Sequence, residues 1–197
     1  MNYKTQKGSK HKLFGFSGVH NNTPNMNYQN EGINPTVDFV ELLNGMPQMV
    51  LKDFIPIMSS NEEDFGIAKL AQSPFSGREA YLAFDGNNET AACGPTSGTG
   101  ISLQYKSKIN KCIPKKFTLG LMYSGMKLEI YGINGNNKTK LLVKDFEVGE
   151  IPSNDTVEVV LTSTETNSYE GFEFDVTGGS STNTPQIAYA QVRGMVG

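Results

Sequence analysis

GFEFDV, residues 171–176, is the stretch of sequence that most clearly indicates the fold. Phe172 and Phe174 alternate in it with Glu173 and Asp175. Successive side chains of a β-strand point to opposite faces of the sheet, so the aromatic rings share one face and the carboxylates share the other. This alternation is typical of a strand that has one face against a core.

Further runs of strand-forming residues surround this stretch and are separated by turn residues. The turns at 134–137 (NGNN) and 178–181 (GGSS) supply Gly and Asn, which adopt positive φ readily. The other predicted strands lie at 100–105, 116–123, 126–131, 156–161 and 185–192. A set of short strands of this kind predicts an all-β fold, a jelly-roll β-sandwich of about eight antiparallel strands. We expect this sandwich to span residues 73–197.

The N-terminal part of the chain has a different composition. Residues 1–34 are rich in Asn, Gly, Ser and Thr and have too few apolar side chains to offset the entropy of ordering. Asn34 can cap a helix and Gly45 can end it, so we predict one short helix near 35–44. Residues 1–72 are therefore predicted to form an extended N-terminal arm that acts as an anchor.

The segment 46–58 is apolar, rich in Met and interrupted by Pro47 and Pro56. The prolines exclude a long helix and a central strand, so we predict an extended segment. Two interpretations are open, and both can hold. The segment packs across the domain that follows it, or it docks on a partner subunit.

Charge and hydropathy exclude two classes of partner. The formal net charge is −3, and the 17 Lys and Arg are scattered along the sequence, so we expect no nucleic-acid partner. No run of about 18 apolar residues is present, so we expect no membrane insertion. The polar, basic start has no apolar stretch behind it, which predicts that there is no signal peptide. Cys93 and Cys112 are interpreted as free thiols rather than as a disulfide.

Residues 80–90, AYLAFDGNNET, resemble the A-x-x-A-F-D-G-N-x-x-T signature of discoidin-like domains, also called coagulation factor 5/8 type C domains and carbohydrate-binding module family 32. Three weaker matches to this family follow in the same order, at 103–105, 128–137 and 186–194. The resemblance covers residues 73–197. It implies a jelly roll, in agreement with the strand pattern.

The resemblance also implies a metal site. In this family the D-G-N-x-x-T loop often holds a calcium ion, and the matching ligand positions here are Asp85, Asn87 and Thr90. The family usually completes the shell with a Glu in the closing strand, where this sequence has Tyr189 and Ala190. The alternative interpretation is that the carboxylate of Asp85 accepts backbone N–H bonds and holds the turn.

Glycan binding in the family uses aromatic platforms in the loops at one end of the sandwich, supported by Arg, His or Asn. This chain has no Trp, and it has Ala-Ala-Cys where the family has an aromatic residue after the calcium loop. The candidate ligand-binding residues are Arg78, Tyr81 and Tyr123, and Phe75 and Tyr169 could help to rebuild a platform. Tyr and Phe are also frequent core residues of a sandwich, so both interpretations stay open.

No catalytic residues are predicted. The two histidines, His11 and His20, both lie in the polar arm, and a Ser-His-Asp or Cys-His arrangement would need the arm to fold into a pocket. The Gly-rich stretch 94–100 lacks the Lys and the following helix of a phosphate loop. We expect that the protein is not an enzyme.

Two functions follow from these observations. The first is a non-enzymatic structural or decoration protein of a bacteriophage virion, made in the host cytoplasm. Its arm would anchor to capsid or tail subunits, or to further copies of the chain, and its discoidin-like domain would be displayed for adhesion to a cell-surface glycan. The alternative is a stand-alone, lectin-like carbohydrate-binding module. An enzyme with an appended binding module is excluded, because residues 1–72 are too few and too polar for a catalytic domain.

Overall fold

The computed structural model describes residues 49–87, 93–122, 125–147, 149–151, 155–178 and 184–197. The predicted helix near 35–44 lies outside these residues, as do His11 and His20. The described residues belong to one compact unit, Met49–Gly197. None of the helices described in it is long and apolar enough to cross a membrane.

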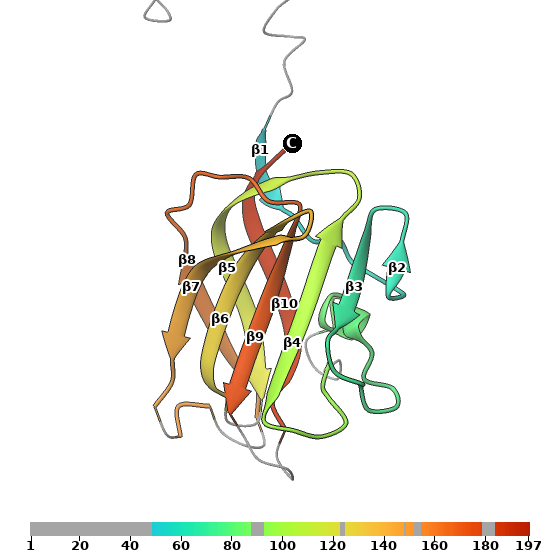
Figure 1. Ribbon diagram of the computed structural model, residues 1–197, viewed down its shortest axis with the longest axis vertical. Helices are drawn as coiled ribbons and strands as arrows, with labels where there is room; N and C mark the ends of the chain where they lie inside the picture. The colour runs from blue at the N-terminus through green and yellow to red at the C-terminus, as the bar shows by residue number, and fades with distance from the viewer. Residues whose placement is uncertain (1–48, 88–92, 123–124, 148, 152–154, 179–183) are drawn as a thin grey trace, which may run out of the picture. The chain divides into compact units, whose positions relative to one another are not determined.

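The described strands form two antiparallel sheets that pack face to face (Figure 1). In chain order the elements are β1 (Val50–Asp53), β2 (Glu62–Glu63), β3 (Gly66–Leu70), the 3-10 helix η3 (Ala80–Ala83), β4 (Gly100–Ser107), β5 (Cys112–Met122), β6 (Gly125–Asn134), β7 (Asn137–Asp145), β8 (Val157–Thr162), β9 (Gly171–Gly178) and β10 (Gln186–Val196). The smaller sheet has the order β1-β10-β5-β8 and the larger sheet has the order β2-β3-β4-β9-β6-β7. The all-β sandwich predicted from the sequence is confirmed.

Strand β9 contains the GFEFDV stretch and lies inside the larger sheet, between β4 and β6. Phe172 and Phe174 are fully buried against the smaller sheet side of the core, as the alternation predicts. Glu173 points to the other face, yet only 4% of it is exposed. The carboxylate face is therefore covered as well, because neighbouring strands carry long polar side chains over it.

Aromatic rings from both sheets fill the centre of the core. The ring of Phe172 meets the rings of Phe54 and Phe117 edge to face, with centroids 5.6 Å apart in both pairs. Phe54 also meets Tyr105 at 5.7 Å. Edge-to-face contacts of this kind add to the free energy gained from burying the ring area. One aromatic cluster thus joins the two sheets.

The sheets begin earlier in the chain than the expected boundary at residue 73. Strand β1 pairs with β10, and the chain then buries Phe54, Ile55 and Met58 in the core. From residue 49 on, the segment 46–58 therefore packs across the domain, which is the first of the two interpretations. The boundary differs because a short strand that ends before Pro56 gives little strand signal in the sequence. Docking of this segment on a partner stays a prediction.

Both cysteines are free and buried. Burial raises the pKa of the Cys93 thiol, and it raises the pKa of the Cys112 thiol to about 12. A thiol in this state reacts slowly, because the thiolate is the nucleophile. The interpretation of the cysteines as free thiols is confirmed.

Candidate ligand-binding site

The loops 73–78 and 93–96 lie side by side at the end of the sandwich where β4 and β10 begin. An isolated bridge joins Pro74 to Pro95, and the hydroxyl of Thr96 donates to the carbonyl oxygen of Ser73 at 2.8 Å. The loops are thus tied to each other by hydrogen bonds. This frame can hold side chains in fixed positions at the loop end.

Arg78 is fixed by a buried amide. Its guanidinium Nη1 donates to Oε1 of Gln186, the first residue of β10. Gln186 is only 7% exposed, and its side chain packs closely over Gly94, where an added Cβ would lie 2.8 Å from Gln186 Cγ. A guanidinium has five N–H donors, so this arrangement orients the group and leaves donors for a ligand.

Phe75 precedes Arg78 by three residues in the same loop and is 42% exposed. Its backbone N–H donates to the carbonyl oxygen of Gly94 at 3.2 Å, and its carbonyl oxygen accepts from the N–H of Arg78 at 2.9 Å. We call Phe75, Arg78, Thr96 and Gln186 the loop cluster. It combines an exposed aromatic ring with oriented polar groups, which is the combination that binds a ligand having apolar faces and hydroxyl groups.

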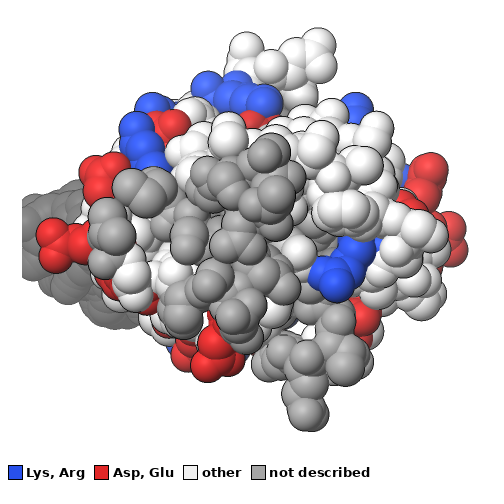
Figure 2. All heavy atoms as spheres, turned by 90° about the horizontal axis from the view of Figure 1, so that it is seen from below, with Lys and Arg blue, Asp and Glu red and all other residues white. Residues whose placement is uncertain are grey.

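Figure 2 views the same end of the molecule. The described surface there is mostly uncharged, and most of its basic and acidic side chains lie toward the margins of the view.

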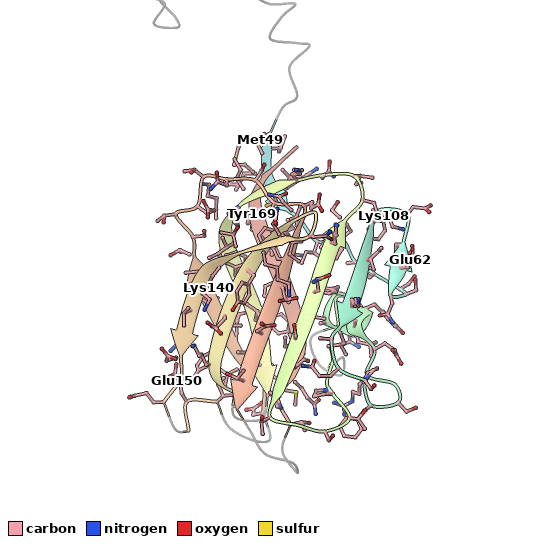
Figure 3. The ribbon with its side chains drawn as sticks, in the orientation of Figure 1. Met49, Glu62, Lys108, Lys140, Glu150 and Tyr169 are labelled. Carbon is pink, nitrogen blue, oxygen red and sulfur yellow. The ribbon has the colours of Figure 1, made fainter. Side chains whose placement is uncertain are left out.

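Two of the tyrosines considered from the sequence have structural roles. Tyr81 is half-buried against the core, and its backbone N–H donates to Oδ1 of Asn61 at 2.9 Å. Tyr169, labelled in Figure 3, is only 3% exposed, and its ring lies 6.0 Å from that of Phe172. The buried Tyr169 therefore offers no free aromatic face, and Tyr123 lies outside the described residues. Ligand contacts by Tyr81 and Tyr123 stay predictions.

The resemblance motif folds as η3 followed by a tight turn. The carboxylate of Asp85 accepts the backbone N–H of Asn87 at 2.8 Å, and Gly86 between them has a φ of 80°. This is the alternative interpretation of Asp85, in which its carboxylate holds the turn. The third candidate ligand, Thr90, lies outside the described residues.

The closing strand β10 has no carboxylate that could join Asp85 in a calcium shell. In the closing strand, the hydroxyl of Tyr189 donates to Oε2 of Glu158 at 2.8 Å, and Ala190 is buried and offers no oxygen from its side chain. In the described part of the chain, no three His, Cys, Asp or Glu side chains come together as metal ligands. Calcium stays a prediction from the resemblance, and we assign it no role.

Thr96 and Gln186 are the members of the loop cluster that we did not single out from the sequence. A signal for Gln186 does exist, because this residue stands in the apolar run Pro185-Gln186-Ile187-Ala188. A polar residue in such a run is either buried with a partner or misplaced. The sequence does not reveal that its partner is Arg78, which precedes it by 108 residues.

The sequence matches no protein-family model and no curated protein. The structure is similar to that of a family 32 carbohydrate-binding module from NanJ of Clostridium perfringens, solved in complex with galactose. The identity is 16%, the match covers 73% of this chain and 99% of that chain, and the TM-score is 0.54. A variant of chitosan-binding module 1 from the chitosanase/glucanase of Paenibacillus sp. IK-5 is similar at 13% identity, with the same coverage of both chains and a TM-score of 0.55.

These neighbours are binding modules, and at this level of identity they show the fold alone. The protein therefore has the discoidin-like sandwich fold implied by residues 80–90. These neighbours do not support attachment to a virion through the N-terminal arm, residues 1–72, which stays a prediction.

Proposed function

We propose that the sandwich is a non-catalytic carbohydrate-binding domain that holds a saccharide on the loop cluster. The observation that carries the proposal is the exposed ring of Phe75 on the same hydrogen-bonded loop as Arg78, whose guanidinium a buried amide orients. A sugar ring has an apolar face that stacks on an aromatic ring and a rim of hydroxyls that accept from N–H donors. The loop cluster offers both kinds of contact on one rigid frame.

The fold neighbours support the same function. The NanJ module was solved in complex with galactose, and the Paenibacillus module is described as chitosan-binding. Both ligands are saccharides. The alternative that we derived from the sequence, a lectin-like module, is therefore the function we favour for residues 49–197.

A glycan array followed by calorimetry tests the proposal. We expect the wild-type protein to retain one or more glycans and Phe75→Ala to weaken the best of them by about tenfold, which corresponds to about 1.4 kcal/mol. Arg78→Lys keeps the charge but loses the planar fork, so it should weaken binding as well. Ile109→Ala is the matched control, because Ile109 is an apolar residue that is 66% exposed and lies outside the loop cluster.

Thermal melting of each variant separates loss of contact from loss of fold. Wild-type protein that retains no glycan, or Phe75→Ala protein that binds as tightly as Ile109→Ala protein, would show that the loop cluster does not bind saccharides.

A further inference from the structure

A pocket of about 500 Å3 lies over the outward-facing side chains of the smaller sheet. It is lined by Asp53, Ile55, Ile57, Ala83, Phe84, Gly86, Lys116, Thr118, Glu158, Tyr189, Ala190, Gln191 and Arg193. None of these residues belongs to the loop cluster. The volume is in the range of pockets that hold small molecules.

Two hydrogen bonds join the segment after β1, which forms one side of the pocket, to strand β10. The side-chain amide of Gln191, on β10, donates through Nε2 to the carbonyl oxygen of Ile55 at 2.8 Å and accepts the N–H of Ile55 at 3.1 Å. The following Ile57 is 73% exposed and lines the pocket near Gly86, where an added Cβ would lie 3.3 Å from Ile57 Cδ1. The pocket therefore has an exposed apolar wall on a backbone that is held in place.

Tyr189 supplies an aromatic ring in a fixed orientation. The ring lies over Gly120, where an added Cβ would come within 2.4 Å of it, and the hydroxyl donates to Glu158 at 2.8 Å. Burial, together with the Glu158 carboxylate, raises the pKa of Tyr189 to about 12. Because the ring is held before any ligand arrives, less entropy is lost when a ligand stacks on it.

The charges of the pocket balance. Asp53 and Arg193 form an ion pair at 2.9 Å. Neither Lys116 nor Glu158 has an oppositely charged partner within the described residues. They lie on adjacent strands but not opposite each other, because Lys116 is opposite Thr162. An ion of either sign would be attracted by one of them and repelled by the other, whereas a neutral polyol can donate to the carboxylate and accept from the ammonium group.

We propose that this pocket is a second saccharide site, which takes a neutral saccharide of one or two rings. The ring stacks on Tyr189 and Ile57, and its hydroxyls bind Glu158, Lys116 and Thr118. The site is independent of the loop cluster. A glycan long enough to reach both sites would bind with a higher apparent affinity than a monosaccharide.

NMR titration of the full chain tests this site. The probes are galactose, glucose, N-acetylglucosamine and their β-1,4-linked disaccharides, with galacturonate and glucosamine as charged counterparts. We expect saturable shifts of the Thr118, Glu158 and Tyr189 amides with at least one neutral probe. We also expect a binding constant at least tenfold weaker in Ile57→Ser and in Thr118→Phe, which fills the pocket. Val160→Ser is the matched control, since Val160 is 48% exposed on the same sheet but does not line the pocket.

Phe75→Ala separates the two sites. It should leave the pocket shifts unchanged, and pocket shifts without loop-cluster shifts would overturn the proposed function while supporting this site. Three results would overturn the second site. They are the absence of saturable pocket shifts with every neutral probe, unchanged binding in Thr118→Phe protein that melts like the wild type, and preference for galacturonate or glucosamine over the neutral sugars.

Discussion

The outer faces of the two sheets use their charged side chains in opposite ways. On the larger sheet, Lys138 contacts both carboxylate oxygens of Glu173, which also accepts from Gln104 at 3.0 Å. Lys140, labelled in Figure 3, pairs on the same sheet with Glu129. The smaller sheet has a pocket there. Asp53 and Arg193 pair in it, but within the described residues neither Lys116 nor Glu158 has an oppositely charged partner. Polar groups that bind one another have few hydrogen-bond donors and acceptors left for a ligand. Charged groups without an oppositely charged partner around a pocket therefore indicate a binding face better than the number of charges does.

Burial explains why the larger sheet needs its pairs. Glu173 is 4% exposed, and a carboxylate that loses its water must regain hydrogen bonds from protein groups. The hydrogen bond to Glu173 raises the pKa of Lys138. Asp175, two residues along β9, has fewer hydrogen-bond donors around it, and burial raises the pKa of its carboxyl. Within the described residues, its Oδ1 is the one buried side-chain oxygen or nitrogen that lacks a hydrogen-bond partner.

The largest effect should come from glycines that lie under aromatic rings. An added Cβ at Gly132 would lie 2.4 Å from the ring of Tyr169, which is 3% exposed and has no room to move. We expect Gly132→Ala to lower the free energy of unfolding by about 3 kcal/mol. Gly120→Ala meets Tyr189 at the same distance, but this half-buried ring can turn toward solvent, so the loss of stability should be smaller.

Urea denaturation measures both losses, and the NMR titration of the pocket shows where Tyr189 has gone. Gly120→Ala should weaken saccharide binding in the pocket, whereas Gly132→Ala should not, at temperatures where it is folded. Equal losses of stability in the two variants would contradict the different burial of the two rings.

The next largest effect on stability should come from replacing Lys138, on the outer face of the larger sheet. Replacing Lys116, on the outer face of the smaller sheet, gives the comparison. Lys138→Met leaves the carboxylate of Glu173 buried with only Gln104 beside it. About half of the Lys138 side chain is exposed, so water replaces part of the lost bond, and we expect a loss of about 1–2 kcal/mol. Lys116→Met removes a cation for which the described part of the chain offers no oppositely charged partner, so the free energy of unfolding should stay within about 0.5 kcal/mol of the wild type.

Binding should follow the reverse order. Lys116→Met should weaken saccharide binding in the pocket, and Lys138→Met should leave it unchanged. Urea denaturation gives the free energy of unfolding of each variant, and NMR titration gives its binding constant for the saccharide. A destabilised Lys116→Met protein would mean that this lysine has a structural partner. The charged groups of the pocket would then bind one another, as those of the larger sheet do.

The fold could be predicted where the burial of one face of a strand requires apolar and polar residues to alternate in the sequence. Phe172 and Phe174 alternate with carboxylates because one face of β9 is against the core. Strand β7, NKTKLLVKD, was not predicted, because it is an edge strand whose first four residues are all exposed, so nothing forces an alternation. Phe54 is a core residue in a segment that Pro47 and Pro56 made unlike a strand.

The candidate sites could be predicted only in part, because they join distant parts of the chain. Arg78 was identified from residue type and position, but its partner Gln186 depends on how β10 meets the loops. The pocket combines Glu158 of β8 with Tyr189 of β10, and β5 lies between these strands in the sheet. Strand order and register decide that contact, and a single sequence does not state either of them.

The smallest expected effect concerns the Tyr189 hydroxyl and depends on pH. Its pKa is raised from 10 to about 12, first by burial and then by Glu158. The neutral phenol is therefore the form that the fold stabilises. Its contribution is complete below pH 10, declines as the pH rises toward 12 and is lost above that value. Because the ring is half-exposed, we expect Tyr189→Phe to cost only about 0.5 kcal/mol near neutral pH.

The difference in free energy of unfolding between wild type and Tyr189→Phe should thus be constant below pH 10 and fall as the pH rises from 10 toward 12. Urea denaturation over this range measures it. Tyr81→Phe is the control near neutral pH, because no hydrogen bond of the Tyr81 hydroxyl occurs in the described part of the chain, and this variant should match the wild type there. If the Tyr189→Phe difference instead grew with pH, the phenolate would be the favoured form. The hydroxyl would then not donate to Glu158, and the ring of Tyr189 would not be held in place for a ligand.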